Sequence, residues 1–420
     1  MARILLLPVP INLKRVSAEQ FVGAAGESQN DWFGDEQLSV RAKTWSNTMR
    51  GHRVNNAEKP VRQAHETSSA RVLLERPLLR EEREAAEVAN AAGGATLPNG
   101  PGHRAIAEEP DPVRTCFERD RDRILHSNAF RRLAGKTQVF IFPGDHQRTR
   151  MTHALEVAQV ARSIAQACRL NVALAEAIAI GHDCGHGPGG HASEDALSPY
   201  VAEGYDHAVW GADVVLAPLN LCLETLDGVR NHSWSRPAPM TAEGEVVSWA
   251  DRIAYVCHDF EDAVNAGLLT SNDLPHAVVE ACGKTRSSQL NAFIAGIVES
   301  VATTGIIGMT DHMASALAAF RTFNYERIYL RAESRLQAHR VTDLLQALVE
   351  HYAKHPAQLP ETWPRSADLI GASESDRLRA AVTYVGGMTD RYACGRALID
   401  LGWDSSRPPT GIDVGVLTAN

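Results

Sequence analysis

The chain has 420 residues, of which 44% are hydrophobic and 22% charged, proportions typical of a soluble globular protein with one large domain or two ordinary ones. Its net charge of -9 excludes a globally basic surface for nucleic acid and argues against attachment to a membrane surface. The apolar start, MARILLLPVP, is interrupted by Pro8 and is too short to span a bilayer, so we expect no signal peptide and no transmembrane helix.

The seven cysteines are scattered along the chain and form no Cys-x-x-Cys pair. An odd number in this arrangement favours reduced thiols over a disulfide framework. The cysteine pattern therefore predicts a cytoplasmic protein.

Residues 1–110 show only weak periodicity and end in the linker-like stretch GGATLPNGPGH. We expect a partly ordered N-terminal extension that wraps the core or contributes to an oligomer interface. The ordered core is expected over residues 111–404, and residues 405–420, which include SSRPPTG, form a tail.

Three stretches of the core have strong helical periodicity. In the first, Val157, Val160, Ile164 and Cys168 form one apolar stripe; the second is NVALAEAIAIGHD and the third GEVVSWADRIAYVCHDFEDAVNAGLL. TQVFIFPGD looks extended, but strand signals are otherwise almost absent, so the sequence predicts an all-α fold.

Each of the three helices carries potential metal ligands. His153 lies on the apolar stripe of the first helix, where a single histidine is more often a packed core residue than a ligand. The second helix delivers His182 and Asp183 to the glycine-rich loop, residues 181–194, GHDCGHGPGGHASE. On the third helix, Asp251 shares one face with the acidic and aromatic residues that follow it, Tyr255, Asp259 and Asp262. Two imidazoles and two carboxylates suit one divalent first-row ion or Mg²⁺, with positions left for water and substrate.

This H…HD…D pattern resembles that of the HD-domain phosphohydrolases, and within them the deoxyguanosinetriphosphate triphosphohydrolase family. HD alone is a weak match, but six blocks recur in the family's order between Asp111 and Trp403. They are RDRDRILHSNAFRRLAGKTQVF, RTRMTHALEVAQVARSIA, GHDCGHGPGGHASEDAL, GYDH, ADRIAYVCHDFEDA and GGMTDRYA. The resemblance implies the helical HD-domain fold with additional helices.

The resemblance also implies roles for individual residues. The implied metal ligands are His153, His182, Asp183 and Asp251. The implied catalytic residues are His191, Glu194 and His207, the implied phosphate contacts are Arg150, His186 and Arg252, and the implied deoxyribose contacts are Tyr255 and Asp259.

By the same resemblance, the reaction is hydrolysis of a deoxynucleoside triphosphate, dGTP or several dNTPs, at the α-phosphorus, which releases inorganic triphosphate. The expected cofactor is one divalent ion per site. Mn²⁺ and Mg²⁺ are preferred as candidates over Co²⁺ and Fe²⁺. Tyr255 against the sugar would leave little room for a 2′-hydroxyl. A homo-oligomer is implied, and some members respond to a nucleotide effector.

The chain departs from the family at four positions. Cys184, Gly187 and Gly189 replace Leu, Pro and Phe of the common loop HDLGHPPFGH, so we expect a more mobile loop. Ala134 stands where many members have Gln, which leaves one sugar contact in doubt.

Three other functions stay open on the sequence. One is another HD enzyme, a phosphomonoesterase or cyclic-nucleotide phosphodiesterase; one is a nucleotide-sensing assembly protein; and one is a di-iron oxygenase. Arg150, Arg252 and the Tyr255/Asp259 pair favour the triphosphohydrolase over the first. The complete ligand set disfavours the second, and the wider match to hydrolases disfavours the third.

Overall fold

The computed structural model describes residues 40–45, 49, 51–54, 60–360, 369 and 371–410. By its internal contacts the chain divides into two units, Met1–Pro77 and Leu78–Asn420. The second unit begins before the boundary expected at residue 110, because the segment that precedes Asp111 is bonded to the core. Thr96 donates its backbone N–H and its hydroxyl to the buried Glu243, and Arg104 forms an ion pair with the buried Asp120.

The first unit contains the only two strands in the described part of the chain. These are β1 (His52–Arg53) and β2 (Arg62–Gln63), which pair antiparallel with His52 opposite Gln63. Residues 40–45 are helical. The first part of the expected extension, residues 1–39, and the end of the expected tail, residues 411–420, lie outside the described residues.

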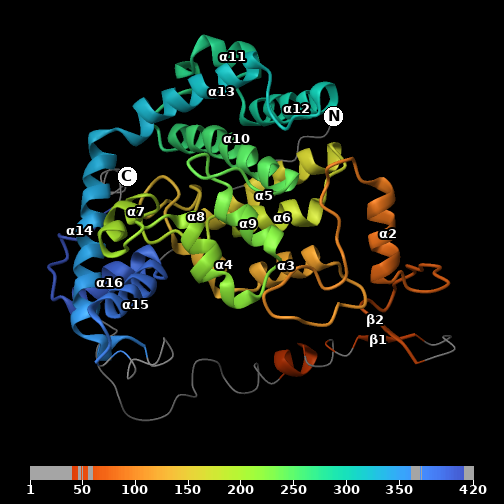
Figure 1. The fold of residues 1–420 in the computed structure, drawn as a ribbon, viewed down its shortest axis with the longest axis horizontal. Helices are drawn as coiled ribbons and strands as arrows, with labels where there is room; N and C mark the ends of the chain where they lie inside the picture. Colours follow the sequence, from red (N-terminus) through yellow and green to blue (C-terminus); the bar gives the residue numbers. More distant parts are fainter. Residues whose placement is uncertain are drawn as a thin grey trace. The chain divides into compact units, whose positions relative to one another are not determined.

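The second unit is helical, which confirms the all-α prediction (Figure 1). Its α-helices are α2 (Arg80–Asn90), α3 (Cys116–Leu125), α4 (Asn128–Arg132), α5 (Arg150–Ala167), α6 (Val172–Gly181), α7 (Ala192–Leu197), α8 (His207–Trp210), α9 (Leu223–Asn231), α10 (Ala242–Asn265), α11 (His276–Cys282), α12 (Arg286–Thr304), α13 (Asp311–Asn324), α14 (Ala332–Lys354), α15 (Glu374–Gly386) and α16 (Asp390–Asp400). Short 3-10 turns cover Leu133–Gly135, Ser198–Tyr200, Ala217–Leu219, Ser271–Asp273 and Pro356–Gln358, and π turns cover Gly211–Val215 and Tyr325–Tyr329. The stretch TQVFIFPGD forms no strand, only an isolated bridge between Thr137 and Thr149.

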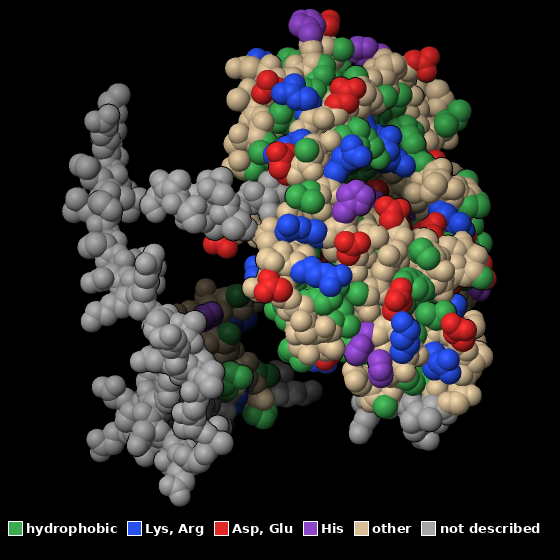
Figure 2. All heavy atoms as spheres, turned by 90° about the vertical axis from the view of Figure 1, so that its left-hand side faces the viewer, with side chains coloured by type: hydrophobic (Ala, Val, Ile, Leu, Met, Phe, Trp, Pro, Cys, Tyr) green, Lys and Arg blue, Asp and Glu red, His purple; other side chains and the backbone are tan. Residues whose placement is uncertain are grey.

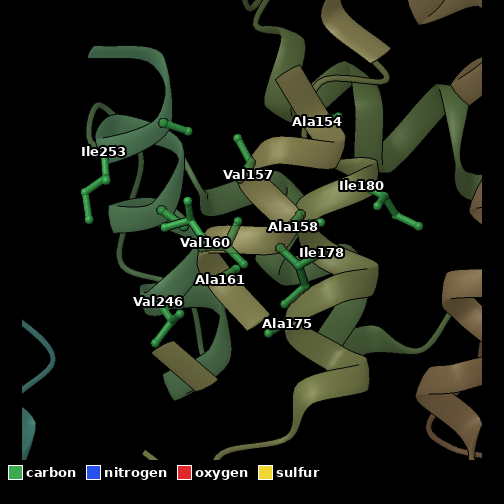
Figure 3. Packing of buried hydrophobic residues seen from close by; sticks show 14 of the residues in the cluster. Ala154, Val157, Ala158, Val160, Ala161, Ala175, Ile178, Ile180, Val246 and Ile253 are labelled. Atoms are coloured by element: carbon green, nitrogen blue, oxygen red, sulfur yellow. The ribbon is translucent and has the colours of Figure 1, made fainter. Parts of the chain in front are cut away.

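The main core lies between α5, α6 and α10 (Figure 3). The apolar stripe predicted on α5 is buried, and its alanines let the neighbouring helices approach closely. Figure 3 shows Ala158 and Ala161 of α5 beside Ile178 of α6, with Val160 on the side of Val246 of α10. The same packing that buries these residues fixes the three helices that carry the predicted metal ligands.

A second apolar cluster joins α14, α15 and α16 to α7 and the turn after it. In Figure 1, α14 runs along the side of the molecule next to α7, α15 and α16. The glycine-rich loop leads from α6 of the main core to α7 of the second cluster, so its two ends are anchored in different hydrophobic clusters.

Acidic and basic side chains are interspersed over the face of the second unit that Figure 2 shows. That face therefore has no broad field of one sign. Among the described helices none has the length and apolar character needed to cross a lipid bilayer.

Candidate active site

The four predicted metal ligands converge from three helices. Oδ1 of Asp251 lies 3.1 Å from Nε2 of His153 and 3.7 Å from Nε2 of His182. Oδ1 of Asp183 lies 3.5 Å from Nε2 of His182, and Oδ2 of Asp183 lies 3.9 Å from Nε2 of His153. Atoms this close to one another can reach a single ion with bonds of about 2.0–2.2 Å. The grouping places His153 inside the site and not only in the core.

The donor atom of His182 has no partner in the protein. Its Nδ1 lies 2.6 Å from the carbonyl oxygen of Ala179 in the last turn of α6, and the N–H donated there leaves the lone pair on Nε2. That Nε2 is buried and forms no hydrogen bond. An orphaned imidazole nitrogen beside two carboxylates fits a divalent cation, because a cation would satisfy all of them.

The two carboxylates are held in their ionised form. Burial raises the pKa of Asp183, but Arg150 and the adjacent imidazoles of His182 and His186 more than offset this and lower its pKa well below the usual value. For Asp251, burial is likewise outweighed by the hydrogen bond from His153 and the neighbouring imidazoles, so its pKa is also lowered. Both acids are therefore available as negatively charged ligands at neutral pH.

Arg150 and His186 lie directly beside the metal ligands. Nη1 of Arg150 donates to Oδ2 of Asp183 at 2.7 Å, while its buried Nε and Nη2 have no partner in the protein. Nε2 of His186 is 3.1 Å from Oδ1 of Asp183. Burial and the adjacent charges of Arg150 and His207 lower the pKa of His186, so it is neutral at neutral pH. The free guanidinium donors are suited to an anionic group of a ligand.

Glu194 joins the two histidines that the sequence placed in catalysis. Its Oε2 lies 3.3 Å from Nδ1 of His191, and its Oε1 lies 2.6 Å from Nδ1 of His207. The His191 ring is largely exposed, whereas His207 is buried and stacks on His186 with ring centres 3.8 Å apart. Burial lowers the pKa of His207, but the hydrogen bond and charge of Glu194 raise it overall.

His232 belongs to the same cluster, although no feature of the sequence separates it from ordinary packing histidines. Its Nδ1 lies 2.8 Å from the carbonyl oxygen of Val229, and its Nε2 lies 3.2 Å from Nε2 of His207. It is buried close to His182 and Asp183. Burial and the charges of His182 and His207 lower its pKa to about 3, which makes it a neutral acceptor for an N–H of His207.

The polar face of α10 continues beyond Asp251 with Arg252 and Tyr255. Nη1 of Arg252 donates to the Tyr255 hydroxyl at 3.1 Å, and the same hydroxyl accepts a hydrogen bond from Nε of Arg321 at 2.7 Å. The guanidinium of Arg252 lies over the ring of Trp234, 4.2 Å from its centre. Arg321 and Trp234 could not be predicted from the sequence, because neither residue lies in one of the six blocks that resemble the family.

Asp259, one turn beyond Tyr255, is buried against another missed residue, Tyr329. The Tyr329 hydroxyl donates to Oδ2 of Asp259, while Oδ1 is buried with no partner in the protein. Burial raises the pKa of Asp259 to about 7, and the Tyr329 bond only partly opposes this. The free oxygen is a ready acceptor for a hydroxyl of a bound ligand.

The first half of the glycine-rich loop is buried, which argues against the greater mobility expected from its composition. Residues 182–188 are all buried. Cys184 is 3% exposed, and burial raises the pKa of its thiol to about 12. Gly189 has φ of +74°, and a Cβ there would lie 2.5 Å from Cγ1 of Val341 on α14. A phenylalanine at Gly189 would not fit this backbone. Ala134, in the position of the doubtful sugar contact, is exposed.

Comparisons with known proteins find two family matches in this chain. The HD domain profile matches residues 150–256, which include all four predicted metal ligands, and the phosphohydrolase-associated domain profile matches residues 307–397. A solved structure titled a hypothetical protein from Aquifex aeolicus aligns with a TM-score of 0.39 and 16% identity over 67% of this chain and 71% of that chain.

Curated relatives share the name deoxyguanosinetriphosphate triphosphohydrolase-like protein. One from Caldanaerobacter subterraneus subsp. tengcongensis is 39% identical over 297 residues, which cover 69% of this chain and 86% of the relative. One from Clostridium perfringens is 38% identical over 69% of this chain and 87% of the relative. One from Roseobacter denitrificans is 35% identical over 69% of this chain and 92% of the relative. The chain therefore belongs to the deoxyguanosinetriphosphate triphosphohydrolase-like family of HD-domain proteins.

Proposed function

We propose that the protein hydrolyses deoxynucleoside triphosphates, dGTP or several dNTPs, to the deoxynucleoside and inorganic triphosphate. The observation that carries this proposal is a set of buried polar atoms without partners on α5, on α10 and at the end of α6. The orphaned Nε2 of His182 lies at the metal centre, the free donors of Arg150 beside it, and the free Oδ1 of Asp259 two turns of α10 beyond Asp251. Their order fits a ligand with an anionic end and a hydroxylated end.

The proposed metal ligands are His153, His182, Asp183 and Asp251, and the mixed N/O donor set suits Mn²⁺ or Mg²⁺, with Co²⁺ or Fe²⁺ as alternatives. When bound, such an ion supplies Lewis-acid polarisation of a phosphoryl oxygen and lowers the pKa of a coordinated water. The protein contributes the geometry, because α5, α10 and the end of α6 hold the four ligands in place.

The proposed phosphate contacts are Arg150, His186 and Arg252. Arg150 neutralises charge through donors that have no partner in the protein, and its contact with Asp183 couples it to the metal centre. Neutral His186 can donate or accept without adding charge. We add Arg321 to this group, because its guanidinium meets Arg252 at the same Tyr255 hydroxyl and lies at the open end of the site.

The proton transfers are assigned to His191 and His207, with Glu194 between them. His191 is largely exposed, and Glu194 orients its ring through the contact with Nδ1. His207, with its raised pKa, is placed to donate from Nε2 at the phosphate or to the neutral His232. The leaving deoxynucleoside oxygen would take its proton from this group of residues.

At the sugar end, the Tyr255 ring and the Asp259 carboxyl are the proposed deoxyribose contacts. Two arginines fix the Tyr255 hydroxyl, so the ring cannot easily move aside for a bulkier sugar. A 2′-hydroxyl would then be excluded by sterics. We also propose a homo-oligomer in the cytoplasm that responds to a nucleotide effector; these three statements rest on the family resemblance and the cysteine pattern.

The decisive experiment incubates the full chain with each dNTP and NTP in Mn²⁺ or Mg²⁺ and identifies the products. We expect deoxynucleoside and inorganic triphosphate from at least one dNTP, and at least tenfold slower turnover of the matching NTP. Orthophosphate alone, or hydrolysis of phosphomonoesters or cyclic nucleotides in preference to dNTPs, would assign the chain to another HD activity.

Asp183→Ala is the matched test of the metal assignment. It should lose metal binding and activity together, because it removes a ligand and the partner of both Arg150 and His186. Asp213→Ala, which alters an exposed ion pair with Arg230, is the control and should retain both. Activity that persists in Asp183→Ala would contradict the proposed site.

A further inference from the structure

Two of the recurring sequence blocks have no part in the reaction proposed above, yet their side chains meet at the glycine-rich loop. The block GKTQVF supplies Lys136 and Thr137, and the block GGMTDRYA supplies Asp390 at the start of α16. Thr137 and Asp390 are 253 residues apart in the sequence. All three side chains are buried, which is unusual for a lysine and an aspartate unless their polar atoms have partners.

Lys136 ties the loop to the end of α15. Its ammonium donates to the carbonyl oxygen of His186 in the loop and to the carbonyl oxygen of Gly386 at 3.0 Å. Its own carbonyl accepts from the backbone N–H of Arg150 at 3.2 Å, at the beginning of α5. One residue therefore joins the loop, α15 and the helix that carries His153.

Asp390 ties the next part of the loop to α16. Its Oδ1 accepts from the backbone N–H of Gly189 at 2.9 Å, while its Oδ2 accepts from the N–H and the hydroxyl of Thr137 at 2.9 and 2.5 Å. A carboxylate in the first turn of a helix is also favoured by the helix dipole. The carboxylate thus holds Gly189 and Thr137 at fixed positions relative to α16.

These contacts grip the loop at 186 and at 189, on both sides of Pro188. His186 carries its imidazole to Asp183, and His191 follows Gly189 by two residues. We propose that Lys136 and Asp390 are positioning residues, which hold the loop so that His186 and His191 face the reacting phosphate. Through these two residues, the C-terminal helices α15 and α16 contribute to the geometry of the active site. The inference rests on the proposed function for its kinetic readout only.

A purely structural role for Asp390 is the competing explanation, and α16 offers a matched control. Asp400, ten residues later on the same helix, accepts from the Tyr352 hydroxyl at 2.5 Å and from Arg396. It fastens α16 to α14 by polar bonds of the same kind, and none of these bonds reaches the loop. Asp400→Asn therefore perturbs the packing of α16 without releasing the glycine-rich loop.

The test compares Asp390→Asn with Asp400→Asn in the full-length protein. An asparagine keeps the size of the side chain, but its amide nitrogen cannot accept a hydrogen bond, so one side of the grip is lost. In Asp390→Asn we expect kcat for dNTP hydrolysis to fall by about 10–100-fold, with Mn²⁺ affinity within about twofold of wild type, because no metal ligand is altered. In Asp400→Asn, kcat should stay within about twofold of wild type.

Two milder variants keep the proposal testable if Asp390→Asn does not fold. Lys136→Met removes both ammonium bonds at similar length, and Thr137→Val removes only the hydroxyl bond to Asp390. Both should lower kcat without weakening Mn²⁺ binding, Lys136→Met more than Thr137→Val. Equal kcat losses in Asp390→Asn and Asp400→Asn, or a kcat in all three loop variants within about twofold of wild type, would overturn the proposal.

Amide hydrogen exchange tests the loop contacts independently of the proposed function, because the measurement requires no substrate turnover. Peptides that cover residues 184–194 should exchange faster in Asp390→Asn and in Lys136→Met than in wild type, whereas Asp400→Asn should leave them unchanged. If the wild type released no triphosphate, the proposed function would be wrong, but the exchange data would still test whether Lys136 and Asp390 hold the loop. Unchanged exchange of the loop in both variants would show that neither residue holds it.

Discussion

At the scale of single residues, the site is built from polar atoms that the fold buries without giving them partners. Nε2 of His182, Nε of Arg150 and Oδ1 of Asp259 are all in this state. An unsatisfied buried polar atom costs about 1–3 kcal/mol, so each is retained against a stability penalty that a bound ligand would relieve. The penalty is largest for a group that must also carry charge.

Asp259 gives a testable consequence of that penalty. Its pKa is raised from 3.8 to about 7, so the folded state holds a proton that the unfolded state has lost between these values. The stability that this proton confers is present below pH 3.8 and is lost as the pH rises through about 7. Asp259→Asn has no such proton to lose and should gain stability relative to wild type, by about 1–4 kcal/mol, between pH 5 and pH 8.

Urea denaturation in EDTA at the two pH values measures this difference. Glu299→Gln, in which an exposed carboxylate is removed from α12, is the control and should show the same offset from wild type at both values. An Asp259→Asn offset that did not change with pH would mean that the carboxyl is ionised in the folded protein throughout this range.

At the scale of elements, the glycine-rich loop depends on backbone shapes that few residues adopt. Gly189 combines a φ of +74° with a close approach to Val341 on α14. Gly267, after the end of α10, has a similar φ of +71° but no atom within 4 Å of the position of a Cβ. Comparing alanine substitutions at the two glycines therefore separates the cost of backbone strain from the cost of a steric contact.

Gly189→Ala should therefore destabilise the protein more than Gly267→Ala does. We expect about 1–2 kcal/mol for Gly267→Ala from strain alone, and about 2–5 kcal/mol for Gly189→Ala from strain and the contact with Val341. Chemical denaturation of both variants gives the comparison. Equal losses would indicate that α14 moves aside at little cost, and that the loop is less tightly enclosed than its contacts suggest.

Local periodicity in the sequence was sufficient to predict the helices that carry the proposed metal ligands, but not the complete site. Spacing alone puts His153 on the stripe of α5 and Asp251 and Asp259 on one face of α10, because i to i+4 geometry is a local property. Their roles in the site are implied only by the family resemblance. His232 and Arg321 were missed because each reaches the site through a fold contact and not through a neighbour in sequence. The blocks around Lys136 and Asp390 were visible, but their meeting depends on packing between distant helices.

At the scale of the whole molecule, the metal centre lies where three core helices meet. A ligand that binds only the folded state stabilises it by about 2.7 kcal/mol when its concentration is one hundred times Kd. Mn²⁺ at that excess should raise the melting temperature of the metal-free wild type by several degrees, because α5, α6 and α10 are joined through one ion.

Asp251→Ala should abolish this thermal shift, since Asp251 contributes the only predicted ligand on α10. Glu299→Ala, an exposed acid on α12, should keep it. An equal Mn²⁺ shift in Asp251→Ala and wild type would show that the ion stabilises the protein from another place. Differential scanning calorimetry with EDTA-treated protein measures all three.

The burial of Cys184 has a consequence for the chemical durability of the protein. A thiol beside Asp183, a proposed metal ligand, would ordinarily be a target for oxidants and alkylating reagents, since the thiolate is the reactive form. Here the side chain is almost inaccessible, and its pKa of about 12 keeps it a thiol at neutral pH. Oxidative or electrophilic stress should therefore spare this position in the folded enzyme, so that cysteine replaces the family's leucine as an inert apolar residue and not as a redox sensor.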